Sequence, residues 1–200
     1  MQASVMALGH RIRAIYDEKT IRVYQAYGVE IGNEVIECGH FGSKFSLERM
    51  TWIKPSFLWM MYRCGWGEKE GQSTIFAIDI KREGFYAIVE EAVLSSYSQE
   101  LYGTHENWKY LLNKSKVRCQ WDPDRDIYGN PMPYKAIQLG IKDEFISRYV
   151  NDWIVKMTDV TPVVMELREK KRHKRLEESM LPKESEYPYC VLTKQSIQLK

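Results

Sequence analysis

The stretch from residue 49 to residue 66, RMTWIKPSFLWMMYRCGW, constrains the fold more than any other part of the chain. Proline is favoured in the first turn of a helix and glycine just past its end, so Pro55 and Gly65 delimit a predicted short helix. The residues between them are apolar on almost every side, which predicts a helix enclosed by other elements. Burial of the largest aromatic side chains here contributes on the order of 10–15 kcal/mol as an upper bound, comparable with the whole stability of a domain.

Composition predicts one folded core. The 200 residues are 44% apolar and 12% aromatic, which suits a single substantial core rather than a disordered chain. The net charge of +2 is too small for bulk electrostatic binding of nucleic acid, so such binding must be local. No apolar run approaches the ~18 residues of a membrane span, and residues 1–10 lack the apolar region of a signal peptide. We therefore expect a cytoplasmic protein with no membrane partner.

The cysteines are scattered and form no Cys-x-x-Cys pair, so we expect reduced thiols rather than a disulfide framework. Cys38 and His40 supply only two of the three or four ligands that a zinc site requires, so no metal site is predicted. Cys64 is expected to be a buried structural residue rather than an activated thiolate. The full set of cysteines is Cys38, Cys64, Cys119 and Cys190.

Hydrophobic periodicity outlines the secondary structure. Strands are predicted over residues 11–16, 73–80, 117–122 and 134–141, and helices over 29–38, 55–64, 83–94, 106–113 and 142–157. The 73–80 segment is apolar on both faces, which places it centrally in a sheet. Asp79 near its end is either functional or, as we expect, satisfied by a neighbouring turn. Residues 22–27 are ambiguous, and residues 95–105 are predicted to form a surface loop.

This order of elements predicts an α+β fold with one mixed or antiparallel central sheet packed by several helices. We expect the core domain to span residues 1–161. Residues 162–200 are predicted to form a charged helix followed by a loosely packed tail from about residue 180.

The predicted hairpin carries the main functional hypothesis. Alternation in its two strands places Gln120 and Asp122 on one face of the first strand and Gln138 on the polar face of the second. If the strands pair, these side chains point into the same space. This face is either a functional site or the solvated outer side of an antiparallel sheet, and the sequence leaves both open.

Several cationic and aromatic side chains are candidates for ligand binding. Lys54 and Arg63 flank the central helix, where their stems cover apolar surface or their charges hold an anion in a cleft. Arg13, Arg22 and Tyr24 either line a site or lie on the surface. The basic part of the C-terminal helix is either simply solvated or contacts the phosphates of RNA or DNA. Its residues are Lys170, Lys171, Arg172, Lys174 and Arg175.

Three aromatic-rich motifs resemble the family called domain of unknown function 4291. They are residues 49–63, residues 22–27 (RVYQAY) and residues 120–125 (QWDPDR), and the resemblance covers about residues 11–161. The family name implies no reaction. No P-loop, Rossmann glycine pattern, Gly-x-Ser-x-Gly elbow or kinase signature is present.

A weaker resemblance is to the ADP-ribosyltransferase superfamily, whose fold is our best structural expectation. In that superfamily an Arg or His on an early strand helps hold NAD, an aromatic ring packs on the nicotinamide, and Gln-x-Glu or Glu-x-Glu on a later strand serves catalysis. Gln120-Trp121-Asp122 has that spacing, with Asp where Glu is usual, and no Ser-Thr-Ser triplet is present.

This resemblance implies an NAD-dependent transferase with nucleic acid among its acceptors, in which Asp122 and Gln120 are catalytic. The alternative is a non-catalytic module that binds nucleotides or nucleic acid by stacking and phosphate contacts. The residues implied in binding NAD are Arg13, Arg22, Tyr24, Trp52, Lys54, Arg63 and Gln138.

Overall fold

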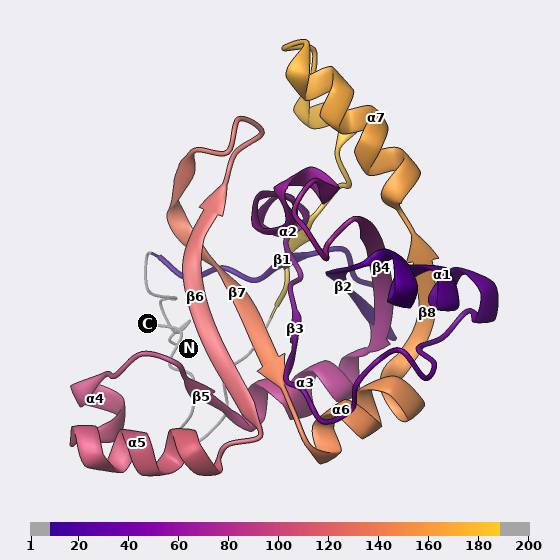
Figure 1. Cartoon of the computed structure of the whole chain (residues 1–200). Coiled ribbons are helices and arrows are strands. Elements are labelled where there is room, and N and C mark those ends of the chain that lie inside the picture. The colour runs from indigo at the N-terminus through magenta and orange to yellow at the C-terminus, as the bar shows by residue number, and fades with distance from the viewer. Residues whose placement is uncertain (1–8, 189–200) are drawn as a thin grey trace.

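A three-stranded and a four-stranded sheet form the framework of the computed structural model, which describes residues 9–188 (Figure 1). The three-stranded sheet is antiparallel and has the order β2-β4-β8. Its middle strand is buried except near its end, which confirms the central position predicted for this segment. The strands are β2 (Thr20–Tyr27), β4 (Thr74–Lys81) and β8 (Ile154–Asp159).

The four-stranded sheet has the order β3-β7-β6-β5 and contains the predicted hairpin. Strands β6 and β7 pair antiparallel, as predicted, and β5 adds to β6 in the parallel direction. Figure 1 shows the long hairpin standing beside β3, with the three-stranded sheet on the other side of β3. The strands are β3 (Thr51–Ile53), β5 (Ala92–Leu94), β6 (Val117–Arg125) and β7 (Pro131–Ile141).

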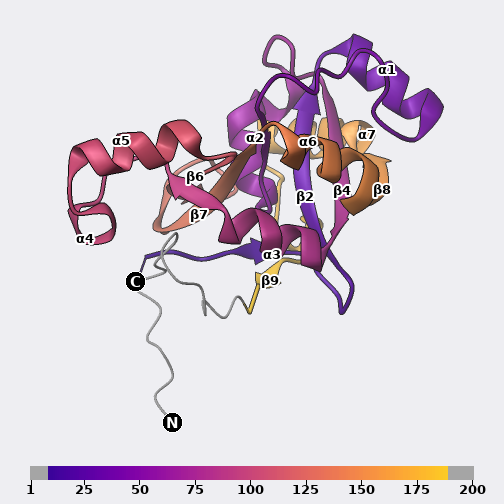
Figure 2. The same cartoon turned by 90° about the horizontal axis from the view of Figure 1, so that it is seen from below.

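Helices surround the two sheets. Seen from below, α4 and α5 lie at one end of the molecule and α1 at the other, with α3 across the front (Figure 2). A π-helical turn, Tyr149–Trp153, continues α6. The α-helices are α1 (Val29–Cys38), α2 (Phe57–Cys64), α3 (Arg82–Glu90), α4 (Gln99–Tyr102), α5 (His105–Lys114), α6 (Glu144–Arg148) and α7 (Thr161–Arg172).

Helix α2 confirms the enclosed helix predicted from the central motif. Its first turn is capped by Ser56, whose hydroxyl accepts a hydrogen bond from the Trp59 backbone N–H at 3.4 Å, so Pro55 lies just outside the helix. Gly65 ends it with φ 58°, a left-handed conformation that favours glycine. Most of its side chains are buried, with Tyr62 and Arg63 exposed.

A second apolar cluster forms around α2. Phe57, Met60 and Met61 pack with Ile75 of β4. Helix α7 adds Val164 and Leu167 to this cluster, so one face of the charged helix is buried in the core while the rest is largely polar. The larger cluster draws residues from both sheets, including β2 and β4, and from α3.

Two predicted helices are too long. The helix expected over 142–157 ends at Trp153, and residues 154–159 form β8, because an extended segment there pairs with the free edge of β4. The helix expected over 83–94 ends at Glu90, and residues 92–94 pair with β6 as β5. Short apolar runs do not distinguish helix from strand by periodicity alone.

Smaller differences concern loops and edges. The ambiguous segment 22–27 is part of β2, and the strand expected over 11–16 is reduced to β1 (Arg13–Ala14). The predicted surface loop 95–105 contains α4, and Leu111 of α5 is 37% exposed rather than inward.

The tail was expected to be loosely packed, and this is wrong for residues 184–187. Strand β9 (Ser185–Glu186) pairs with β1, and the Tyr187 ring is fully buried. The Glu184 carboxylate accepts a hydrogen bond from the Phe57 backbone N–H at 2.6 Å, at the start of α2. The proposed boundary at residue 161 stays a prediction, and residues 189–200, with Cys190, lie outside the described residues.

Candidate functional site

A cavity of about 720 Å³ opens between the two sheets, within the size range of small-molecule sites. Its walls come from β2, β3, the start of α1, the loop before β3, α2 and the β6–β7 hairpin. Most of the predicted site residues line it, namely Trp52, Lys54, Arg63, Gln120, Asp122 and Gln138. The other lining residues are 25–28, Ile31, 44–46, 49–51, Trp59, Met60, Gly71 and Gln72.

Asp122 is held by two glutamine amides. The antiparallel register places Gln120 opposite Gln138, so the polar faces of the two strands coincide as predicted. Gln120 Nε2 donates to Asp122 Oδ1 at 2.9 Å, and Gln138 Nε2 donates to Asp122 Oδ2 at 2.7 Å. The carboxylate orientation is therefore fixed from both sides, and all three side chains line the cavity.

Lys54 lies where the two sheets meet. It follows β3 directly, and its carbonyl accepts a hydrogen bond from the Tyr24 backbone N–H of β2 at 2.7 Å. The side chain is only 5% exposed, although it lines the cavity. Burial, and secondly the Arg63 guanidinium, lower the pKa of Lys54 from 10.5 to about 8, against the opposing effects of Cys64 and Asp122.

The cavity is strongly cationic. Lys44, Arg49 and Arg63 join Lys54 on its walls, and Asp122 is the one carboxylate among the lining residues, giving a formal charge of +3. Within residues 9–188, none of these four cationic side chains forms an ion pair. Such a site attracts an anion. The sequence reasoning missed Lys44 and Arg49, although Arg49 stands inside the central motif.

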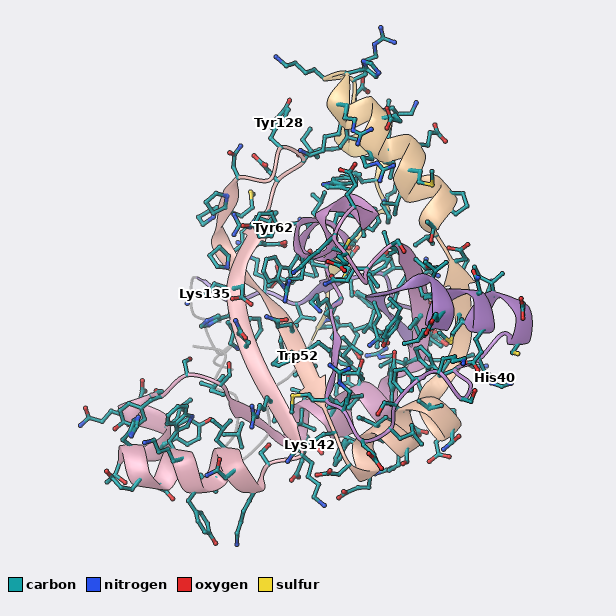
Figure 3. The ribbon with its side chains drawn as sticks, in the orientation of Figure 1. His40, Trp52, Tyr62, Tyr128, Lys135 and Lys142 are labelled. Carbon is teal, nitrogen blue, oxygen red and sulfur yellow. The ribbon has the colours of Figure 1, made fainter. Side chains whose placement is uncertain are left out.

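The Trp52 indole packs against the backbone of β7 at Gly140, and Figure 3 shows Trp52 beside the hairpin. Trp52 pairs with Gly140 of β7, where an added Cβ would come within 2.9 Å of the indole carbons and 2.8 Å of Met50 Sδ. Glycine at 140 thus leaves room for this indole wall of the cavity.

Gly140→Ala is expected to destabilise the protein by about 1–3 kcal/mol, because the new methyl group displaces the indole or the thioether. Urea unfolding followed by tryptophan fluorescence measures this effect. Gly28→Ala is the control, since its Cβ would meet backbone atoms no closer than 3.6 Å. Equal unfolding midpoints for both variants would contradict the close packing described for Trp52.

A buried hydrogen-bond network joins β2 to β3 beneath the cavity. Gln25 Nε2 donates to Thr51 Oγ1 at 2.8 Å, and the Tyr149 hydroxyl donates to Gln25 Oε1 at 2.8 Å. The Tyr27 and Thr51 hydroxyls share a further bond of 2.9 Å. Gln25 is 2% exposed, and its polar identity inside a buried strand is the signal that sequence reasoning could have used.

Three predicted binding residues lie outside the cavity lining. Arg22 forms a bidentate pair with Asp79 of β4, at 2.7 and 2.9 Å, so Asp79 is satisfied by this arginine and not by a turn. Tyr24 is 1% exposed and packs edge-on against Phe57. Arg13 donates to the Tyr134 hydroxyl at 3.1 Å. Strand alternation explains the positions of Arg22 and Tyr24, because Gln25 and Tyr27 face the cavity while Arg22 and Tyr24 belong to the other face of β2.

The basic residues of α7 do not line the cavity either, and several are already paired. Lys170 pairs with Glu166 at 3.3 Å, and Arg172 pairs with Glu169 and Glu68. Lys171 Nζ donates to the Tyr128 carbonyl at 3.3 Å. Lys174 and Arg175 remain exposed at the end of the helix. The paired glutamates, Glu166, Glu169 and Glu68, partly neutralise α7 and so reduce its attraction for phosphates.

No cysteine within residues 9–188 lines the cavity. Burial raises the pKa of the Cys64 thiol, so the thiol stays protonated near neutral pH. Cys38, Cys64 and Cys119 are free thiols. The part of the chain that the structure describes contains no group of three or more His, Cys, Asp or Glu side chains arranged to hold a metal ion.

The motifs that build these walls belong to a recognised family. The family model described as "Domain of unknown function (DUF4291)" matches residues 11–187. The chain is a DUF4291 protein. None of the curated proteins matches the sequence. The DUF4291 match extends past α7 to Tyr187, so it includes the segment that packs against β1 and α2. Among residues 9–188 of this DUF4291 protein, no helix combines the length and apolar content that crossing a bilayer requires.

Proposed function

We propose that the cavity binds a nucleotide and that the protein transfers the ADP-ribosyl group of NAD, with Asp122 as the catalytic carboxylate. The observation that supports this proposal is the convergence of unpaired cations, an indole wall and one oriented carboxylate in a single cavity. A nucleotide offers the matching groups, which are phosphates, a flat ring and ribose hydroxyls.

In this proposal the cations hold the phosphates. Arg63 and Arg49 present planar guanidinium groups suited to bidentate contact with phosphate oxygens, and Lys54 adds a point charge deeper in the site. Trp52 stacks on a flat ring of the ligand, an interaction worth ~1–3 kcal/mol in nucleotide sites. Arg13, Arg22 and Tyr24 have no part, because other contacts hold them away from the cavity.

The proposed reaction breaks the bond between the ribose C1′ atom and the nicotinamide nitrogen. Nicotinamide leaves with the electron pair, and positive charge develops on the ribose. The Asp122 carboxylate stabilises this charge, and Gln120 and Gln138 keep it oriented, so it needs no reorganisation during the reaction. The nucleophile of the acceptor then bonds to C1′ and releases its proton.

Calorimetric titration with NAD, together with chromatographic detection of released nicotinamide, tests the proposal. Asp122→Asn is expected to reduce nicotinamide release by about 100-fold or more while NAD still binds. Asp152→Asn, at an exposed position of the π-helical turn, is the matched control and should leave turnover unchanged. Failure of NAD to bind the wild-type protein would overturn the proposal, and a large loss of stability in Asp122→Asn would make the carboxylate structural.

A second candidate is a non-catalytic module for nucleotides or unpaired bases of nucleic acid. The observation in its favour is that both Asp122 oxygens already accept hydrogen bonds within the protein. Saturable binding of ATP or a short single-stranded oligonucleotide, weakened by salt and without nicotinamide release from NAD, would favour this function over glycosyl transfer.

A further inference from the structure

The burial of Lys54 without a counterion gives the cavity a second chemical capability. We infer that the Lys54 amine is a nucleophile that forms an imine with an aldehyde or ketone carrying a phosphate group. This inference uses the anion-binding cavity of the proposed function but does not depend on the transfer of ADP-ribose from NAD.

The contacts of Lys54 distinguish it from a structural lysine. Lysines normally extend their charge to water or form an ion pair when they are buried. Lys54 is 5% exposed and, among the described residues, has neither a carboxylate within the 4.0 Å ion-pair limit nor a hydrogen bond to its ammonium group. The charged and titratable groups that act on it are Arg63 and Cys64 of α2 and Asp122 of β6.

A buried site next to a second cation is the environment that an amine nucleophile requires. Only the neutral amine attacks a carbonyl carbon, and burial beside another cation favours the neutral form. The pKa of Lys54, lowered to about 8, leaves roughly a tenth of the amine neutral at pH 7. An exposed lysine, with its pKa at the ordinary value of about 10.4, has very little neutral amine at this pH.

The backbone fixes the point from which the Lys54 side chain extends. Lys54 precedes Pro55, which restricts it to an extended conformation, and its carbonyl bonds to the Tyr24 N–H across the junction of the sheets. The side chain therefore starts from a fixed point between the two sheets and borders the same cavity as Asp122 and Arg63.

The reaction is balanced without a further reagent. The neutral Lys54 amine adds to the carbonyl carbon and forms a carbinolamine, and loss of one water molecule from this adduct gives the imine. Asp122 lines the same cavity, and in this inference its carboxylate carries the protons from nitrogen to oxygen in these two steps. The remaining cations, Arg63, Arg49 and Lys44, bind the phosphate of the substrate, which is why a phosphorylated carbonyl compound fits better than a neutral one.

Pyridoxal 5′-phosphate is a suitable probe, because it carries an aldehyde, a phosphate and a flat ring and its imine absorbs visible light. After reduction with borohydride, peptide mass mapping is expected to place the dominant adduct on Lys54. Pyridoxal, which lacks the phosphate, should label this position about tenfold less at the same concentration.

Lys54→Arg keeps the positive charge but has no amine that can form the imine. Lys54→Met removes the charge and the amine. Each of these variants should therefore lose the adduct. Lys109→Arg, at an exposed position of α5 outside the cavity lining, is the matched control and should keep it. Thermal unfolding of each variant establishes that it is folded. Labelling spread over surface lysines, or undiminished in folded Lys54→Met, would overturn the inference. Binding of NAD by a wild-type protein that forms no imine would leave the proposed function standing and this inference refuted.

Discussion

Replacing Lys54 with methionine should make the protein more stable at pH 7 by roughly 3 kcal/mol. This follows from the fall of its pKa from 10.5 to about 8 on folding, because burial without an ion pair disfavours the charged form. Methionine fills a similar volume and carries no charge. The same change should weaken the binding of a phosphorylated ligand, so stability and binding move in opposite directions.

The difference in stability between Lys54→Met and the wild type should depend on pH. Between pH 8 and pH 10.5 the unfolded chain holds a proton on Lys54 that the folded protein has released, so the stability of the wild type rises with pH across this window. The advantage of Lys54→Met should therefore shrink over the same range. Urea unfolding at a series of pH values measures the difference, with Lys44→Met at an exposed wall position as the control. A difference independent of pH would show that Lys54 is not buried in its charged form.

Trp59→Ala should destabilise the protein by about 3–5 kcal/mol, the usual loss for a large buried aromatic side chain. Trp59 is 5% exposed and stacks on Tyr62 with their ring centroids 5.6 Å apart. Its removal opens a gap between α2 and the hairpin, where the Arg125 guanidinium lies over both rings.

Tyr62→Ala is the matched control for this prediction, because Tyr62 belongs to the same stack but is 47% exposed. Its expected cost is below about 1 kcal/mol. Trp59→Phe keeps an aromatic ring but removes the Trp59 Nε1 group, which is buried without a hydrogen-bond partner in the described structure. This variant therefore separates the contribution of ring packing from the cost of the unpaired N–H. A cost below about 1 kcal/mol for Trp59→Ala would mean that α2 does not support the core as described.

The parts of the site that sequence reasoning predicted depend on local signals. Pro55 and Gly65 delimit α2 within two residues, and strand alternation with a turn-rich connection pairs β6 with β7. Because side chains two residues apart share a face, the grouping of Asp122 with Gln120 and Gln138 follows from the hairpin alone. Lys54 precedes α2 and Arg63 lies in its last turn, and both line the cavity with Asp122.

The parts that could not be predicted depend on contacts between distant segments. The sequence of β2 does not reveal which of its faces meets the cavity, and the pairing of Arg22 with Asp79 is decided by the register of β2 and β4. Residues 154–159 have an apolar spacing that suits a helix, but the open edge of β4 selects a strand. Glu184 and Tyr187 lie in a segment whose prolines and charges give no sign of burial.

The bond between Glu184 and the start of α2 links residues 127 positions apart, and β9 pairs with β1 near the other end of the described chain. During synthesis, α2 and the hairpin are therefore made long before the segment that completes the contact at the start of α2. Contacts of such long sequence separation form late and slow the search for the native state. The cavity wall that carries Trp59 and Arg63 thus acquires its final support only when nearly the whole family domain has been synthesised.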